Sequence, residues 1–426
     1  MKLQEFSFGN FRSFKDINTL NLAPAKIKSK NPSLDENNII DHEKQAFLKS
    51  KAIYGANASG KSNIIKAMVI FLNIVEKSVS NNKVLDMVDP FLLSTETEKD
   101  STFFQMIFWI EDVKYRYGFE VDKEEVLAEW LFGTPNIREL PYFIREKGDI
   151  IKIDKTNFKE GYKFRSLLAD QGNEIFRKNS LFLSTLASFG FSKLSKKLIN
   201  EITSIQVING LQSSVFHNYA KDLLENKDEK AYILNLLKIA DIGIEDIVDY
   251  DFPINKIPKE ADENIRSALN DSKFLISSRK KFDKNKAIIG LEPMMFEEDE
   301  SEGTKKLFEL SPFIYSTFKE KTILFIDEFD ARFHPLLTCK IVELFNSKEN
   351  KESQLVFTTH DTNLLNADLL RRDQIDFVEK DKYGSSHIYS LVEFNGTRKD
   401  NLFEKNYIEG KYGAIPFLGD FKELIK

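Results

Sequence analysis

The sequence has very little cysteine and histidine, which limits the chemistry open to it. Its one cysteine, Cys339, cannot form an intramolecular disulfide and excludes a cluster of thiolate metal ligands. The five histidines lack the short spacings that are typical of metal sites. We therefore expect a protein of a reducing cytosol that has no disulfide framework.

Long apolar runs and an excess of either charge are also missing. No run of 18 apolar residues is present, and the N-terminal MKLQEFSFGNFRSF alternates like a strand and does not resemble a signal peptide. A cytoplasmic protein with no membrane partner is the expectation. The 61 lysines and arginines nearly balance the 67 aspartates and glutamates, giving a net charge of −6. Nucleic acid is therefore not indicated as a partner, and its binding would need a local patch.

The sequence shows no repeat and no long heptad run, and its patterns divide it into three parts. Residues 1–164 are expected to form the N-terminal half of an α/β head domain with an antiparallel β-subdomain, in which 25–47 is a long polar loop. Residues 165–290 predict an inserted lobe of four or five helices, followed by a mobile basic arm over 253–287. Residues 291–426 return to alternating strands and helices and are expected to complete the head.

The strongest motif is a phosphate-binding loop. The segment GANASGKS matches G-x-x-x-x-G-K-[ST] in full and lies between an apolar stretch and an amphipathic helix pattern, which disfavours a chance glycine loop. Its backbone N–H groups can surround a β-phosphate, Lys61 adds a cation for the β- and γ-phosphates, and the Ser62 hydroxyl can coordinate Mg²⁺. The residues expected to bind ATP here are Gly55, Asn57, Ser59, Gly60, Lys61, Ser62 and Asn63.

A second motif, TILFIDE, ends in two carboxylates. An apolar run carries Asp327 to the end of a predicted strand, where it could hold Mg²⁺ through water. Glu328 follows at the position of a general base for an attacking water molecule. An apolar strand that ends in Asp-Glu is common by itself. Together with the phosphate-binding loop, it predicts a site for ATP hydrolysis in which Lys61 and Glu328 are catalytic.

Two weaker signals flank this strand in the sequence. The segment SQLVFTTHD carries His360 to the end of another predicted strand, where we expect a catalytic contact with the γ-phosphate; a structural histidine is the alternative. The segment SEGT, from Ser301 to Thr304, precedes a helix pattern. A serine hydroxyl and glycine amides at a helix N-terminus form a second phosphate cradle. These four letters are common, so the interpretation depends on their place before the TILFIDE strand.

The order of these motifs resembles the ABC/SMC/RecF superfamily of ATPases. Within it, the chain is similar to stand-alone bacterial AAA-type ATPases, a group that includes the ATPase AriA of the PARIS phage-defence system and relatives of OLD proteins. The similarity spans nearly the whole chain and is weakest over 165–290. The segments that carry it are GNFRSFKD, YRYGFEVD, ESEGTKKL, ILFIDEFDARFHP, TTHDTNLL, RRDQIDFVEKDKYGSSHIYSL and YIEGKYGAIP.

This resemblance implies a head-to-tail homodimer, or a higher oligomer, that shares two ATP molecules between subunits. The nucleotide contacts that it adds are Arg12, Ser13, Ser301, Gly303 and Asp330. Ser301 and Gly303 would reach the ATP held by Lys61 of the other subunit, and Asp330 would communicate across the dimer. For Arg12, an exposed strand charge is an equal alternative. The signature reads SEGT and not LSGGQ, and no glutamine can be assigned securely to a Q-loop.

Several functions fit these features. The first is an ATP-hydrolysing switch that controls an effector, encoded nearby and nuclease-like, in anti-phage defence by abortive infection. An ATP-driven nuclease is the second, although Asp373, Asp376 and Asp381 lack a convincing acidic triad; a nuclease site within the insert stays open. A RecF-type protein of DNA binding or repair would depend on the basic stretch at Arg279–Lys281, which a solvated loop explains equally well. An ABC transporter motor fits least.

Overall fold

The computed structural model divides the chain into two compact units. The first contains Met1–Asn209, Lys321–Phe329 and Cys339–Lys426, and the second contains Gly210–Glu320 and Asp330–Thr338. In the part of the chain that is described, the helices are too short or too polar to span a bilayer. The described residues are 1–42, 44–171, 177–210, 214–240, 242–251, 273–394 and 402–416.

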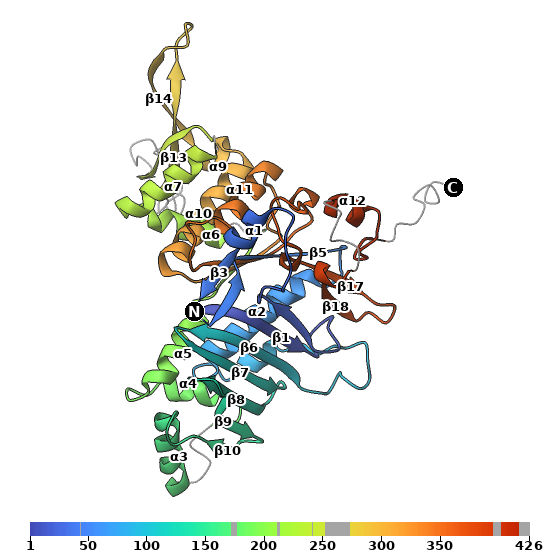
Figure 1. Ribbon diagram of the computed structural model, residues 1–426. Helices are drawn as coiled ribbons and strands as arrows, with labels where there is room; N and C mark the ends of the chain where they lie inside the picture. Colours follow the sequence, from blue (N-terminus) through green and yellow to red (C-terminus); the bar gives the residue numbers. More distant parts are fainter. Residues whose placement is uncertain are drawn as a thin grey trace, which may run out of the picture. The chain divides into compact units, whose positions relative to one another are not determined.

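A six-stranded sheet lies in the first unit (Figure 1), with the order β11-β15-β16-β5-β17-β18. All neighbours are parallel except the last pair. Every residue of β5, β15 and β16 is buried, as expected for parallel strands. The strands predicted at TILFIDE and SQLVFTTHD are confirmed as β15 and β16, and α11 (Pro335–Phe345) connects them. The strands are β11 (Gln206–Asn209), β15 (Ile323–Asp327), β16 (Gln354–Thr358), β5 (Ser50–Gly55), β17 (Ile375–Lys380) and β18 (Ser386–Ser390).

The same unit contains a seven-stranded antiparallel sheet with the order β10-β9-β8-β7-β6-β1-β2. Burial alternates without interruption along β6, so one face of this strand is covered. The predicted β-subdomain is confirmed, as is the α/β class with a mixed sheet. The strands are β1 (Lys2–Gly9), β2 (Asn18–Asn21), β6 (Thr102–Ile110), β7 (Val113–Val121), β8 (Val126–Thr134), β9 (Leu140–Glu146) and β10 (Asp149–Ile153).

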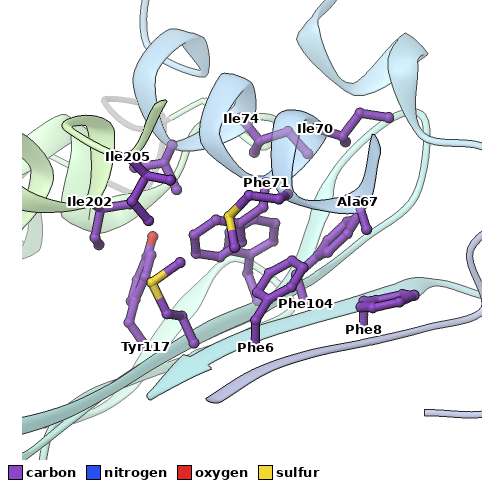
Figure 2. Packing of buried hydrophobic residues seen from close by; sticks show 14 of the residues in the cluster. Phe6, Phe8, Ala67, Ile70, Phe71, Ile74, Phe104, Tyr117, Ile202 and Ile205 are labelled. Atoms are coloured by element: carbon purple, nitrogen blue, oxygen red, sulfur yellow. The ribbon is translucent and has the colours of Figure 1, made fainter. Parts of the chain in front are cut away.

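The helix α2 (Lys61–Lys77) packs against both sheets. Its Phe71 stacks on Phe119 of β7 with ring centroids 5.3 Å apart. Phe71 also meets Phe6 of β1 edge-on at 5.6 Å (Figure 2). Other contacts of α2 go to β5, β11 and β15. A helix covered on two sides must be apolar around most of its surface. This packing fixes the first turn of α2, which carries Lys61, relative to both sheets.

A buried ion pair in the antiparallel sheet lies at the start of the short helix α4 (Phe182–Ala187). Glu129 in β8 and Arg145 in β9 lie 3.5 Å apart, and both side chains are at most 1% exposed. Glu129 also accepts hydrogen bonds of 2.5 and 3.0 Å from the N–H groups of Phe182 and Leu183 at the start of α4. Burial raises the pKa of Glu129, whereas Arg145 and these two donors favour its ionised form.

Replacing Glu129 by alanine is expected to lower the free energy of unfolding by about 3 to 5 kcal/mol, because a buried cation loses its carboxylate. Urea denaturation of the purified variant measures the change. The matched control is Glu124→Ala, which removes an exposed glutamate near the start of the same strand. Equal urea midpoints for the two variants would contradict a stabilising role for the buried pair.

Two predictions about local structure in the first unit were wrong. The segment 25–47, expected as a loop, contains α1 (Pro32–Asn37), β3 (Ile39–His42) and β4 (Gln45–Leu48). The helix has recognisable start signals, since the Asn31 side chain accepts a hydrogen bond from the Ser33 N–H and proline follows the cap. The second error concerns the predicted insert, whose helices α3 (Lys159–Gln171), α4 and α5 (Lys193–Thr203) lie in the first unit.

The second unit combines helices with a three-stranded antiparallel sheet, whereas the sequence predicted helices followed by a mobile basic arm. Part of the predicted mobile arm is a regular strand here, and 253–272 lies outside the described residues. The strand was missed because its polar side chains are paired: Ser277 and Arg279 both donate to Glu300, at 2.7 and 2.5 Å. The elements are α6 (Ser214–Leu223), α7 (Lys227–Ile239), β12 (Ile244–Asp251), β13 (Lys273–Phe282), β14 (Ile288–Met295), α9 (Phe296–Asp299) and α10 (Glu302–Glu320).

Candidate active site

The phosphate-binding loop joins the buried strand β5 to the helix α2. Ala58 has a φ of 62° and Gly60 a φ of 117°, so the chain turns sharply before the helix begins. A Cβ atom on Gly60 would lie 2.6 Å from Ser386 Oγ and 2.7 Å from Ser13 Oγ. Glycine is therefore required here by both the backbone conformation and the close approach of two hydroxyl groups.

The side chains of the loop are arranged for an anion. Lys61 is only 6% exposed, and its ammonium donates to the carbonyl oxygens of Gly55 and Ala56 at 2.7 and 3.1 Å. The Ser59 hydroxyl is buried and has no hydrogen-bond partner among the described residues. The N–H groups of the first turn of α2 carry the positive end of the helix dipole. Together these groups suit the phosphates of a nucleotide.

Asp327 lies at the carboxyl end of β15, as predicted. Its Oδ1 accepts hydrogen bonds from Ser62 Oγ at 3.2 Å and from Thr358 Oγ1 at 2.6 Å. A serine hydroxyl beside a carboxylate is the type of oxygen donor set that Mg²⁺ prefers. The two residues predicted as metal ligands, Ser62 and Asp327, are therefore adjacent and fit the ion. Thr358 was not predicted, and its role is to orient the carboxylate.

Glu328 and His360 line one pocket together with the phosphate-binding loop. The pocket has a volume of about 640 Å³. Glu328 has a φ of 50°, an unusual conformation for a residue with a side chain, and its N–H donates to Thr358 Oγ1 at 2.8 Å. Local strain of this kind is common in active sites. The residues around the pocket are Asn57, Ala58, Ser59, Gly60, Lys61, Ser62, Asn63, Glu328, His360 and Lys380.

Two further residues near the loop, Ser386 and Lys380, were missed by the sequence analysis. Ser386 of β18 donates to the Ser59 carbonyl at 2.5 Å. Lys380, at the end of β17, lines the pocket itself. Both residues lie in strands, but the order of the strands in the sheet cannot be deduced from the sequence. The rule that ligands bind at the carboxyl ends of parallel strands would have indicated Lys380.

Arg12 lies in a tight turn after β1, and not within a strand. Its φ is 49°, and its guanidinium forms an ion pair of 2.8 Å with Asp89. Arg12 is not among the residues that line the pocket. The adjacent Ser13, which contacts Asn63, brings this turn next to the phosphate-binding loop. Direct contact between Arg12 and a nucleotide stays a prediction.

The predicted signature and Asp330 all lie in the second unit. Ser301 is placed at the start of α10, where its Oγ accepts from the Thr304 N–H at 3.2 Å, as an N-terminal cap does. A Cβ on Gly303 would be 3.0 Å from the Arg332 carbonyl oxygen. The structure therefore places the signature next to the segment that follows Asp330. In the sequence these two motifs are far apart.

The three aspartates considered for a nuclease each have a structural partner. Asp373 accepts from Arg371 at 2.7 Å, and Asp376 forms a buried pair of 2.8 Å with Lys51. The carboxylate of Asp381 accepts backbone N–H groups of its own turn at 2.8 Å. These contacts account for the three side chains without a metal ion.

Comparison with protein families decides what kind of domain this is. A model described as "AAA domain, putative AbiEii toxin, Type IV TA system" (AAA_21) matches residues 52–175 and 187–366, well over half of the chain. The chain belongs to this AAA family. The matched residues include the phosphate-binding loop, the carboxylate strand and His360. β17 and β18 follow the matched region.

Solved structures of SMC head domains resemble this AAA protein at low sequence identity. One is the SMC head domain from Thermotoga maritima, with 13% identity, a TM-score of 0.41, and coverage of 92% of this chain and 99% of that chain. Another is an Smc head domain from Pyrococcus furiosus with an extended coiled coil, bound to the C-terminal domain of ScpA, with 14% identity, a TM-score of 0.39, and coverage of 96% and 99%. No curated protein sequence matches the chain.

Proposed function

We propose that this AAA protein hydrolyses ATP at sites shared between two copies of the chain, and that the ATP-bound dimer controls an effector protein. The observation that carries the proposal is the single pocket formed by Lys61, Glu328 and His360. These residues follow three neighbouring parallel strands, β5, β15 and β16, at their carboxyl ends. A cation, a carboxylate and an imidazole around one phosphate site are the groups that phosphoryl transfer to water requires.

In the proposed reaction, Lys61 and the N–H groups of the loop hold the β- and γ-phosphates. Glu328 orients a water molecule and accepts its proton while the water oxygen bonds to the γ-phosphorus and the bond to the ADP oxygen breaks. His360 hydrogen-bonds to the γ-phosphate. Ser62 and Asp327 would hold Mg²⁺, which neutralises phosphate charge when bound.

A role in defence is supported by the description of the family, which names a toxin of a Type IV TA system. The effector is expected to be nuclease-like and encoded nearby, and cytoplasmic defence by abortive infection is the setting. The rival reading as a DNA-repair protein loses its main support. Arg279, Lys280 and Lys281 all have carboxylate partners in the second unit, at distances of 2.5 to 2.8 Å.

A charge placed in the signature tests whether the site is shared. In a dimer, Gly303→Asp would place a carboxylate against the γ-phosphate bound by the other subunit, and like charges in an interface repel by several kcal/mol. We expect ATP to bind to the variant but hydrolysis to fall by about 100-fold or more. The control is Gly303→Ala, which adds a methyl group without charge and is expected to have a much smaller effect.

Mixing Gly303→Asp with Lys61→Ala protein sharpens this test. Each mixed dimer has one site with both defects and one site with neither, so the mixture should regain part of the activity. Phosphate release by the two variants, alone and combined, is the measurement. If mixed dimers form and release no phosphate, or if Gly303→Asp alone is fully active, the shared site is contradicted.

A further inference from the structure

Lys380 has no role in the proposed reaction, yet it lies at the nucleotide pocket. It is the last residue of β17, the strand beside β5 on the side away from β16, and its side chain lines the pocket with Lys61, Glu328 and His360. The side chain is exposed, and within the described ranges its ammonium has no ion-pair partner. It lies beyond the residues matched by the family model, so membership of the family does not assign it a function.

The hairpin of β17 and β18 fixes the position of Lys380 relative to the loop. Val378 pairs with Gly55, the first residue of the loop, and a Cβ on Gly55 would lie 2.5 Å from the Val378 carbonyl oxygen. Ser386 is the direct cross-strand neighbour of Lys380 and donates its hydroxyl proton to the Ser59 carbonyl at 2.5 Å. The strand end and the phosphate-binding loop are therefore connected by hydrogen bonds and close packing.

We propose that Lys380 binds the phosphates of ATP as a second cation beside Lys61. The other residues that line the pocket are those of the loop, Glu328 and His360, which the proposed reaction places around the phosphates. A lysine ammonium is a mobile point charge that suits a polyphosphate, and its hydrogen bonds to phosphate are strengthened by charge. This inference rests on the proposed function, because it assumes that the pocket holds ATP.

The affinity for ATP, measured by titration with a fluorescent ATP analogue, tests the proposal. Lys380→Met is expected to weaken binding by about ten-fold, the loss of one charge-assisted hydrogen bond, while Lys380→Arg keeps most of the affinity. The matched control is Lys382→Met, which removes a charge two residues away, where the lysine lies over the Tyr383 ring. The melting temperature without nucleotide should be unchanged in all three variants, because these side chains are exposed.

The outcomes separate this inference from the proposed function. If the wild-type protein binds no ATP, the proposed function itself fails, and the inference with it. If the wild type binds ATP and Lys380→Met binds it equally well, the inference is overturned and the function stands. Equal weakening in Lys380→Met and Lys382→Met would also overturn it, since a general charge effect would then explain the loss.

Discussion

Replacing Glu328 by glutamine is expected to slow ATP hydrolysis by about 100-fold or more while ATP stays bound. The amide has the size of the carboxylate but cannot accept a proton from the attacking water. Binding should persist because the phosphates are held by Lys61 and the loop, which the substitution does not touch. The dimer that forms with ATP should then be long-lived, since hydrolysis is the step that releases it.

Two measurements on Glu328→Gln check this expectation: steady-state phosphate release and the amount of nucleotide that stays with the protein after gel filtration. The control is Glu320→Gln, which removes an exposed carboxylate at the end of α10. Normal turnover by Glu328→Gln would remove this residue from the catalytic role. Slow turnover together with lost ATP binding would show that the carboxylate is needed to bind ATP, and would contradict a role as general base alone.

The largest effect on binding is expected from Lys61→Ala. The ammonium is the only side-chain cation within the loop itself, and losing its contacts with two phosphates should weaken ATP binding by about 100-fold. The fold should survive, although the hydrogen bonds to Gly55 and Ala56 contribute about 1 kcal/mol each.

Isothermal titration with ATP measures this loss, and a melting curve without nucleotide checks the fold. Lys66→Ala is a close control, because Lys66 is an exposed lysine on the same helix. An affinity of Lys61→Ala equal to that of Lys66→Ala would mean that the loop does not bind the nucleotide as proposed.

The local parts of the site could be predicted from the sequence. The phosphate-binding loop and the strand that ends in Asp327 and Glu328 are continuous segments whose residue types dictate their conformation. Strands of the antiparallel sheet could also be predicted, because aromatic and β-branched residues are frequent in segments such as TFFQMIFWI of β6. The conformation of these loops and strands depends on residues that are close in the sequence, so the sequence is enough to predict it.

The parts that could not be predicted depend on contacts between distant segments. Ser386 reaches the loop only because β18 lies beside it. The strand β13 was missed because Glu300 pairs with Ser277 and Arg279, which makes a polar segment suitable for a sheet. A partner that is distant in the sequence allows a polar side chain to be buried in a sheet. The periodicity of the sequence does not reveal such a partner.

Phosphate release by the purified wild-type chain with ATP and Mg²⁺ is the most direct test of the central claim, that the pocket of Lys61, Glu328 and His360 hydrolyses ATP. The account predicts release that saturates with ATP, rises with protein concentration as dimers form, and falls to background in a parallel preparation of Glu328→Gln. Release that stays at background in the wild type, or that is unchanged in Glu328→Gln, would contradict it.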